Sequence, residues 1–571
     1  MNKKTIHLGS NFSQKLDLWV NSILIVLFFM LMNASILKHY ILVRYDFYNI
    51  HRIGELLIFG MIFLRLFFPS QAASQGIEIY RNLPLPAQTI IPFFFFWGLL
   101  SCLDNGFSAD NLLWVAHIAA LLLSSLYIAS LVRQNPSKIG RILLFLVVIS
   151  SAYYMFFEWM YYGITQYFTH FLPGISLDMD KLIPNLRYPG YSNPRFLGQV
   201  LSWILPLVIL PYVFFKPKNK PLSFLFLLIA AGLWQMFWMG QSRALYLELL
   251  VCAVLIPVLF HKQPLVYRYL KAQGLALLLG LILYMVLYHL SYSLPERSFS
   301  EEGGDSGRFM IWHFTISLIL QNPLYGIGPL NFIHYGAKLF NISHPHNAAL
   351  FFTVEWGIPA GLALIFLTLW GLKTWVQFSR KISLTLINAN PAITPSSENL
   401  LFIIAITTSL LAGFLNSGFS GTLLMPASQM CLGLVLGWSL GIYQSNQTAN
   451  PKDSPILGSR RSQIFLRIII LILAGLILKG IFPTVLKLPE EQNQACLNAA
   501  DTEHPFRCPI IPSYWANHPG MEGTLINIAT PQPPQEEQGI PLANPLSNDS
   551  LRKTPGESPT FQPPLASLPA K

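Results

Sequence analysis

Long apolar segments recur along the chain, and short polar segments separate them. Each apolar segment is about 20 residues long, the length that an α-helix needs to cross the hydrocarbon core of a bilayer. The pattern predicts an all-α, polytopic integral membrane protein with about 12–13 transmembrane helices and a large extracytoplasmic loop between the ninth and tenth spans. The predicted spans are centred near Val26, Phe59, Phe95, Leu122, Ile149, Leu205, Ile229, Val251, Leu281, Leu362, Thr407, Leu434 and Leu473.

Composition agrees with a membrane protein. Of the 571 residues, 53% are hydrophobic and 11% are charged, whereas soluble domains carry about 25% charged residues. The first apolar segment, from about Leu16 to Leu37, is long enough to span and has no small-residue cleavage site after it, so we expect no cleavable signal peptide. The net charge of +11 does not indicate nucleic-acid binding, because no basic stripe with interleaved aromatic residues is present.

Lys and Arg residues give the orientation, because they collect in cytoplasmic loops. If the N-terminus is cytoplasmic, one set of loops is basic throughout and the opposite loops hold about half as many Lys and Arg residues. The basic set contains Lys3, Lys4, Lys15, Arg133, Lys138, Arg141, Lys216, Lys218, Lys220, Lys262, Arg268, Lys271, Lys373, Arg380, Lys381, Lys452, Arg460 and Arg461.

This orientation divides the chain into segments, of which three lie on the extracytoplasmic side of the membrane. The predicted segments are N-terminal transmembrane helices in 1–162, an extracytoplasmic loop in 163–195, transmembrane helices in 196–290, a large periplasmic loop in 291–347, C-terminal transmembrane helices in 348–485 and a tail in 486–571.

The tail is rich in Pro, Gln, Asn and Ser, so it buries too little apolar surface to fold and is predicted to be disordered. It contains Cys496 and Cys508, which either form a disulfide in an oxidising compartment or stay unpaired. Cys102, Cys252 and Cys431 lie in or beside spans and are expected to be packing residues.

Four arginines fall on the side that is poor in basic residues. They are Arg187, Arg195, Arg243 in GQSRALYLELL and Arg308 in DSGRFMIWHF. Arginine stays protonated and makes planar bidentate hydrogen bonds to phosphate, so these residues could bind a lipid-linked pyrophosphate. The alternative is contact with lipid headgroups or a snorkelling position.

The sequence His344-Pro345-His346-Asn347 precedes the tenth span. A histidine at the membrane boundary can take a proton from a hydroxyl group near neutral pH, or can orient a substrate. A His-x-His pair can also supply two zinc ligands, but zinc needs a third and usually a fourth. His313 and His334 are near in sequence, and no motif ties them to the pair. A structural histidine is the third interpretation.

Glu355 lies in the run Glu-Trp-Gly-Ile-Pro-Ala-Gly, where Pro359 and the glycines argue against an ideal helix. Its carboxylate either orients a base or accepts an internal hydrogen bond, and the sequence leaves both open. Glu158 and Glu248 are similar intramembrane carboxylates. No P-loop, Rossmann glycine pattern, zinc-protease helix, nucleophile elbow or aspartate-rich metal motif occurs, so a transfer reaction here is expected to need neither nucleotide, metal nor other cofactor.

Several of these motifs together resemble a known family. GGDSGRFMIWHFTISLILQNPLYGIGPLNF, followed by SHPHNAALFFTVEWGIPAGL, resembles the signature region of the O-antigen ligase and O-antigen polymerase superfamily, which includes pilin-type O-oligosaccharyltransferases. MGQSRALYLELL and YSNPRFLGQVLSWILPL resemble two preceding segments, so the resemblance covers about Tyr188 to Gly361. The family's final glycine pattern differs here, because Ala360 fills its last place. That difference, the tail and the thirteenth span bear on the choice of subfamily.

The resemblance implies an inverting, metal-independent glycosyltransferase in the bacterial inner membrane, with its active site facing the periplasm. It would move a glycan from undecaprenyl diphosphate to an acceptor glycolipid, glycan or protein. By the same resemblance, His346 is catalytic, Arg243 and Arg308 hold the donor diphosphate, and Arg195 is a looser match for that role. Asn347 and Glu355 are supporting residues.

Among these reactions, the ligase reaction, from donor to lipid A-core, is the leading hypothesis. A polymerase of O-antigen or exopolysaccharide and a protein O-oligosaccharyltransferase remain alternatives. A multi-span transporter or flippase has a similar size and hydropathy, but such carriers usually show internal repeats and broken helices at midplane. No internal repeat is evident in this sequence, and the signature residues lie in an outer loop instead of at midplane.

Overall fold

The computed structural model describes residues 23–24, 26–27, 30, 47–68, 71–171, 194–215, 219–289, 307–340, 342–387, 395–447 and 462–479, and the structural statements below concern these residues. They lie within one compact unit, Met1–His518. The predicted disordered tail and the Cys496–Cys508 pair lie outside the described residues, as does most of the first predicted span.

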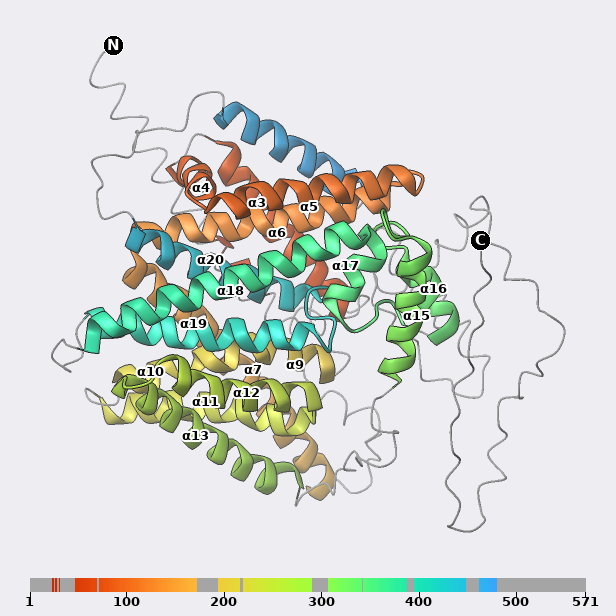
Figure 1. The fold of residues 1–571 in the computed structure, drawn as a ribbon. Coiled ribbons are helices and arrows are strands. Elements are labelled where there is room, and N and C mark those ends of the chain that lie inside the picture. The colour runs from red at the N-terminus through yellow and green to blue at the C-terminus, as the bar shows by residue number, and fades with distance from the viewer. Residues whose placement is uncertain are drawn as a thin grey trace, which may run out of the picture. The chain divides into compact units, whose positions relative to one another are not determined.

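The described residues form helices and no strands. The elements in chain order (Figure 1) are α3 (Phe47–Phe67), α4 (Gln71–Arg81), α5 (Leu85–Asp104), α6 (Ala109–Gln134), α7 (Pro136–Phe171), α9 (Pro194–Val208), α10 (Leu210–Phe215), α11 (Lys220–Gly240), α12 (Arg243–Leu259), α13 (Pro264–Tyr284), η2 (Met285–His289), α15 (Arg308–Gln321), α16 (Phe332–Phe340), α17 (Ala348–Trp356), α18 (Ile358–Ile387), α19 (Pro395–Ser417) and α20 (Pro426–Gln447). A further helix follows at Ser462–Lys479.

The all-α membrane architecture is confirmed. Nine of the described helices are long and apolar enough to cross a membrane: Leu85–Asp104, Asp110–Gln134, Pro136–Met160, Arg195–Phe215, Lys220–Gly240, Pro264–Leu287, Ile358–Leu386, Ser397–Ser417 and Ser462–Lys479. Three other predicted spans coincide with α3, α12 and α20. The first and last of these carry several polar residues, and α12 has 17 residues.

Small residues allow α6 and α20 to pack closely. Gly433, Gly437 and Gly441 lie four residues apart on α20 and face α6. A side-chain carbon at Gly437 would lie 2.6 Å from the carbonyl oxygen of Ser125. The two backbones therefore approach closely, as small residues allow in membrane helices.

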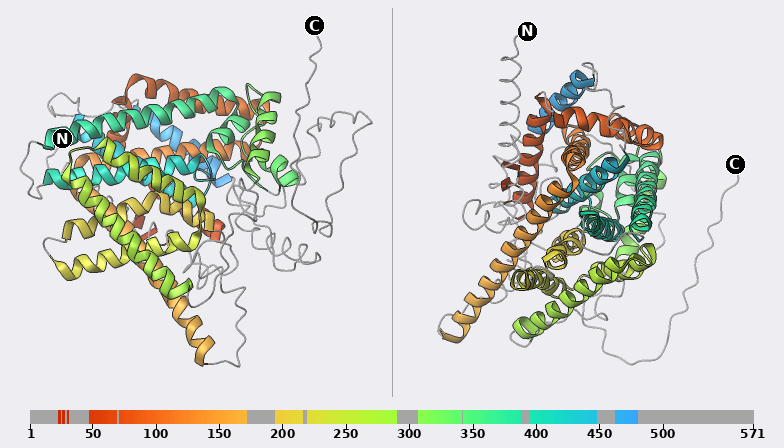
Figure 2. Two further views of the ribbon diagram at one scale, coloured as in Figure 1. Left: turned by 60° about the horizontal axis from the view of Figure 1, so that its bottom comes forward. Right: turned by 90° about the vertical axis from the view of Figure 1, so that its left-hand side faces the viewer.

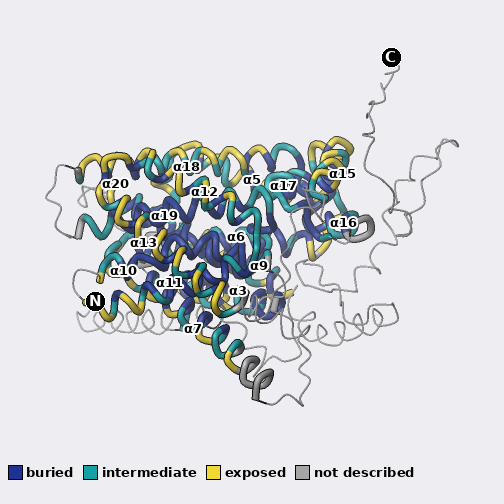
Figure 3. The backbone as a smooth tube through the Cα atoms, turned by 90° about the horizontal axis from the view of Figure 1, so that it is seen from below, coloured by how far each residue is buried: buried dark blue, intermediate teal, exposed yellow. Residues whose placement is uncertain are grey.

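Burial differs between the helices in the way expected for a bundle in lipid. Most of α19 is buried, whereas Leu362, Phe366 and Leu369 on α18 are exposed. Figure 3 shows this contrast along the two helices. Exposed leucine and phenylalanine in such rows are suited to contact acyl chains.

The short helices α15, α16 and α17 gather at one end of the long helices (Figure 1). We call this end, which contains the loop 342–347, the histidine end. The right-hand view of Figure 2 looks along several helices from the opposite end. The predicted loop 291–347 is thus partly helical, and α7 continues to Phe171, beyond the predicted boundary at 162.

Ion pairs lie at the opposite end. Arg133 Nη2 is 2.6 Å from Glu78 Oε1, and Arg141 Nη2 is 2.6 Å from Glu398 Oε2. Arg133 and Arg141 belong to the basic set from which the orientation is predicted. Arg133 and Arg141 therefore lie at the end opposite the histidine loop, and the assignment of the histidine end to the periplasm remains a prediction.

Candidate functional site

His346 is held in a strained backbone conformation. Its φ is +56°, in the left-handed region that non-glycine residues rarely adopt. Such a conformation costs about 1–3 kcal/mol and persists only where its surroundings enforce it. The backbone N–H of His346 donates a hydrogen bond to Nδ1 of His344 at 3.1 Å, and the two rings lie 4.3 Å apart. His344 therefore helps to fix the backbone conformation of His346, which is half-buried.

Neighbouring elements hold this loop from two sides. On one side, Trp312 of α15 donates its Nε1–H to the carbonyl oxygen of Pro345 at 2.9 Å. On the other side lies the segment 418–425, which joins α19 to α20 and which we call the 418–425 loop. Its Gly421 packs on the His344 ring, since a side-chain carbon there would lie 2.6 Å from Nε2.

Asn347 fixes the start of α17. Its Oδ1 accepts a hydrogen bond from the N–H of Leu350 at 3.0 Å, which makes it the N-cap of the helix. Its Nδ2 donates to the carbonyl oxygen of Gly418 at 3.1 Å. These contacts give Asn347 a positional role that ties the histidine loop to the 418–425 loop.

Arg195 and Arg308 lie within electrostatic reach of His346. Burial lowers the pKa of His346 well below its usual value, and the nearby His344, Arg195 and Arg308 lower it further. Burial, with a contribution from Arg195, lowers the pKa of His344 to about 3. Both imidazoles are therefore neutral near pH 7 and can accept hydrogen bonds or protons.

Arg243 lies at a neighbouring helix start. It is the first residue of α12, and Ser242 before it faces Gly198 of α9, where a side-chain carbon would lie 3.4 Å from Ser242 Oγ. Gly198 is about one turn beyond Arg195 on the same helix. The structure thus brings Arg195 and Arg308 together with His346, and places Arg243 beside the helix that carries Arg195.

The three arginines share a structural position. Arg195 is the second residue of α9, and Arg243 and Arg308 are the first residues of α12 and α15. Helix N-termini present backbone N–H groups and the positive end of the helix dipole, which favour anions. Each of these three helix starts is therefore favourable for an anion.

Glu355 stabilises a different part of this end. Its Oε1 accepts a hydrogen bond from the N–H of Phe332 at 3.4 Å, and its carbonyl oxygen accepts from Gly328 N–H and Ser101 Oγ, both at 2.9 Å. These bonds favour the internal hydrogen-bonding interpretation over that of a group orienting a base.

The motif NPLYGIG lies in close contact with the backbone at Gly357, where α17 ends and α18 begins. Gly357 has φ +87° and separates α17 from α18, as the proline and glycines predict. A side chain there would collide with the carbonyl oxygen of Leu324. Pro323 accepts a hydrogen bond from Ile358 N–H at 2.8 Å, and Trp97 Nε1 donates to Leu324 O at 2.7 Å. The motif therefore anchors the segment after α15 to α5 and to the helix break.

The sequence did not predict a series of hydrogen-bonded polar side chains that leads from α12 to the 418–425 loop. Glu248 of α12 accepts a hydrogen bond from Ser202 Oγ at 2.5 Å, and Asn416 Nδ2 donates to the same oxygen at 3.0 Å. Thr422 Oγ1 then donates to Asn416 Oδ1 at 2.7 Å. The available signal was the occurrence of these polar residues within apolar spans, which are costly there unless they are paired.

Among the described residues, no three His, Cys, Asp or Glu side chains come together in a way that could hold a metal ion. Cys102, Cys252 and Cys431 are buried, in agreement with the predicted packing role.

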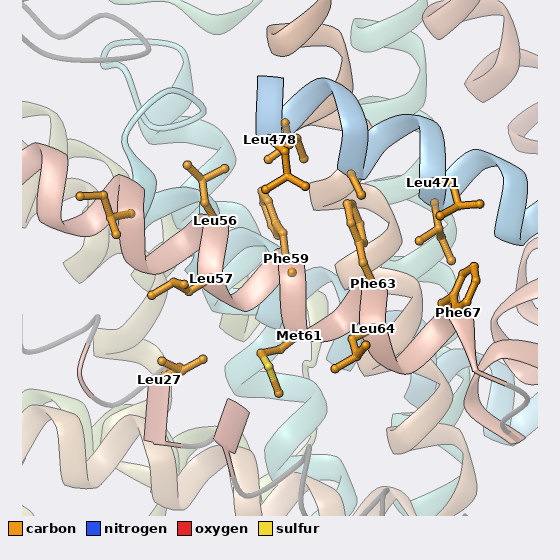
Figure 4. A pocket seen from close by; sticks show the side chains of 15 residues that line it. Leu27, Leu56, Leu57, Phe59, Met61, Phe63, Leu64, Phe67, Leu471 and Leu478 are labelled. Carbon is orange, nitrogen blue, oxygen red and sulfur yellow. The ribbon is translucent and has the colours of Figure 1, made fainter. Parts of the chain in front are cut away.

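Apolar grooves lie along the described helices, and two of them are larger than a third one. One, of about 740 Å³, runs between α3 and the helix 462–479 and is lined by Phe59, Phe63 and Leu471 among other apolar residues (Figure 4). The other, of about 340 Å³, lies between α5, α6, α18 and α20 and extends to Leu423 in the 418–425 loop. The first contains no ionisable residue and does not include any part of the histidine loop.

Comparison with known proteins supports the resemblance. Residues 222–365 match a family model described as O-antigen ligase, which confirms the resemblance for this segment and supports a membrane glycosyltransferase of ligase or polymerase type. The matched segment contains Arg243, Arg308, His346, Asn347 and Glu355, whereas Arg195 precedes it. No curated protein matches the chain.

Proposed function

We propose that this chain, whose residues 222–365 carry an O-antigen ligase domain, transfers a glycan from undecaprenyl diphosphate to an acceptor at the periplasmic face of the bacterial inner membrane. The observation that carries the proposal is the placement of His346, which is held in a left-handed conformation with Arg195 and Arg308 in electrostatic reach. The proposed acceptor is lipid A-core, as in an O-antigen ligase.

The donor half of the reaction is assigned to the arginines. The leaving group is a lipid diphosphate whose negative charge grows as the glycosidic bond breaks, so fixed positive charges lower the barrier. Arg195, Arg243 and Arg308 lie in the first two residues of their helices, so their guanidinium groups and the backbone N–H groups can act together. We propose that Arg243 and Arg308 bind the diphosphate. Arg195, which lies in electrostatic reach of His346, is proposed to bind the same anion.

The acceptor half is assigned to His346. Before the donor binds, burial and the neighbouring arginines disfavour a positive charge on His346, so the imidazole stays neutral and can accept a hydrogen bond from the acceptor hydroxyl. Bound diphosphate neutralises the arginines and raises the pKa of His346, which makes it a stronger base when the donor is present. The acceptor oxygen then attacks C1, the bond to the diphosphate breaks and His346 takes the proton. This single displacement inverts the anomeric centre and needs no metal.

The orientation rests on charge. Arg133 and Arg141 lie at the end opposite His346, which fits the rule that basic residues collect on the cytoplasmic side. A polymerase or a protein O-oligosaccharyltransferase would share the donor half and differ in the acceptor.

The test is transfer by the purified protein in liposomes that contain an undecaprenyl-diphosphate-linked glycan. Lipid A-core, a second glycan chain and a pilin-type protein are offered separately as acceptors, and release of undecaprenyl diphosphate is measured in parallel. Arg243→Ala and Arg308→Ala should reduce donor use strongly, and Lys at either position should restore it only in part, because a point ammonium does not reproduce bidentate binding.

Arg268→Ala on α13 is a matched control, since it removes a positive charge from the opposite end and should leave transfer unchanged. Parental rates for both Arg243→Ala and Arg308→Ala would contradict the diphosphate assignment. Transfer to protein or to a second glycan, but not to lipid A-core, would replace the ligase by one of its alternatives.

A further inference from the structure

A buried charged cluster lies beside the site and has no place in the reaction proposed above. Arg52 and Glu55 of α3 and His117 of α6 are fully buried, together with Gln429 of α20. Arg52 Nη1 is 2.6 Å from Glu55 Oε2, 2.7 Å from Gln429 Oε1 and 3.0 Å from His117 Nε2. His117 Nε2 is also 3.5 Å from Glu55 Oε1. Three helices that are distant in sequence therefore meet at one guanidinium group.

Burying charged groups within a membrane bundle is costly, and such residues are functional candidates. Glu55 compensates the charge of Arg52, but an apolar cluster would join three helices at lower cost. The hydrogen bonds of the second guanidinium nitrogen, Nη2, suggest a role for this buried charge. Arg52 Nη2 donates to the carbonyl oxygen of Leu424 at 2.9 Å and to Tyr48 Oη at 2.9 Å.

Leu424 belongs to the 418–425 loop, which the cluster holds twice. Besides the bond from Arg52 to Leu424, Gln429 Nε2 donates to the carbonyl oxygen of Leu423 at 2.8 Å. The N–H groups of Leu424 and Met425 both donate to Gly421 O, at 2.9 and 3.1 Å. The carbonyls that Arg52 and Gln429 fix are therefore part of the same turn as Gly421.

The same turn supports the histidine loop. Gly421 packs on the ring of His344, and His344 holds the backbone N–H of His346. Gly418 accepts a hydrogen bond from Asn347, the residue after His346. A continuous set of contacts thus leads from Arg52, through the 418–425 loop, to the strained backbone of His346.

We propose that Arg52, with Glu55 as its counter-ion, is a positioning residue for glycosyl transfer, which fixes the 418–425 loop and thereby the orientation of His346. This inference rests on the proposed function. Arg52 acts through the loop and does not contact the substrates.

The first test measures the loop directly and does not depend on transfer activity. Arg52→Lys keeps the charge beside Glu55, but a single ammonium cannot reach both Gln429 and Leu424 as the two guanidinium nitrogens do. Hydrogen exchange of the 418–425 amides should become faster in this variant. Arg65→Lys is the matched control, because Arg65 is a buried arginine on the same helix, and it should leave exchange in this loop unchanged.

The second test measures transfer in a double-mutant cycle. In the parent, Arg52→Lys should lower kcat by roughly 10- to 100-fold, the scale expected from a small misplacement of a catalytic group. KM for the donor should stay near the parental value, because the arginines that hold the diphosphate are unchanged. In the His346→Ala background the same substitution should cost little further, because the group it positions is already absent.

Equal loss in both backgrounds, or a loss matched by Arg65→Lys, would assign Arg52 a structural role only and overturn the inference. Parental exchange and parental kcat in Arg52→Lys would overturn it as well. A parent protein that transfers no glycan under any condition would instead refute the proposed function, and the exchange experiment would still decide whether Arg52 holds the loop.

Discussion

At the scale of single residues, the sequence indicated which side chains could carry chemistry but not how they are held. His346 and the arginines were identified from charge placement and from motifs. The contact between His346 N–H and His344 Nδ1 could not be read from the sequence, because it depends on a positive φ. Arg52 was missed because Gln429, one of its partners, lies 377 residues away along the chain.

Substitution of His346 and substitution of His344 should lower glycan transfer by different amounts and for different reasons. His346→Ala removes the proposed base and should lower transfer by about 10²–10⁴-fold. His344→Ala removes one hydrogen bond to the backbone of His346 and should cost about tenfold. Initial rates in purified membranes, normalised to protein level and measured with and without EDTA, distinguish these outcomes. Equal losses that EDTA reproduces would favour a metal site, and undiminished transfer by His346→Ala would remove that residue from the mechanism.

The pH dependence of transfer should report the charge around His346. The neutral imidazole is the active form, so transfer is retained above the pKa of His346 and lost as pH falls through it. Burial and the three neighbouring groups lower that pKa well below 6.5, so the acid limb should lie well below this value. Arg308→Gln removes one positive charge, which raises the pKa and should move the acid limb to higher pH.

The measurement is kcat/KM against pH, in which the position of the limb is separate from the height of the profile. Arg268→Gln removes a charge from the opposite end and should leave the limb in place. A limb that stays at the parental pH in Arg308→Gln would contradict the electrostatic coupling between these two groups.

At the scale of elements, hydropathy predicted the spans well and the short helices poorly. Long apolar segments have few alternatives to a membrane helix, so nine predicted spans recur as described helices that could cross a membrane. The helices α15 and α16 lie within a predicted loop, because their polar flanks and short lengths obscure the helical pattern. The break at Gly357 was predicted, whereas its partner, the Leu324 carbonyl, required the fold.

Gly357→Ala should destabilise the protein. Its φ of +87° disfavours any side chain, and a methyl group would collide with the Leu324 carbonyl oxygen. We expect a loss of at least about 2 kcal/mol, seen as a lower apparent melting temperature in detergent. Gly371→Ala in α18 is the control, since no atom lies within 4 Å of its added carbon. That change should stabilise the helix by about 0.5–1 kcal/mol. Equal melting temperatures for the two variants would contradict the role of Gly357.

At the scale of the whole molecule, the two ends of the bundle carry different sets of charged residues. The histidine end holds the helix starts with Arg195, Arg243 and Arg308, and the opposite end holds the pairs Arg133–Glu78 and Arg141–Glu398. Alternation of the predicted spans was sufficient to assign residues to one end or the other. It could not indicate which helices lie side by side, because that depends on side-chain packing such as the glycine face between α6 and α20.

Orientation in the membrane gives the last prediction. Gln321, at the end of α15, and Lys381, near the end of α18, are both exposed and lie at opposite ends of the bundle. Each is replaced by cysteine in a chain whose 5 native cysteines are changed to serine. In intact spheroplasts, a membrane-impermeant maleimide should label position 321 and not 381, because basic residues stay on the cytoplasmic side. Both positions should be labelled after permeabilisation, which controls for reactivity. Labelling of 381 alone in intact spheroplasts would place His346 on the cytoplasmic face and remove the lipid-linked periplasmic donor from the proposed reaction.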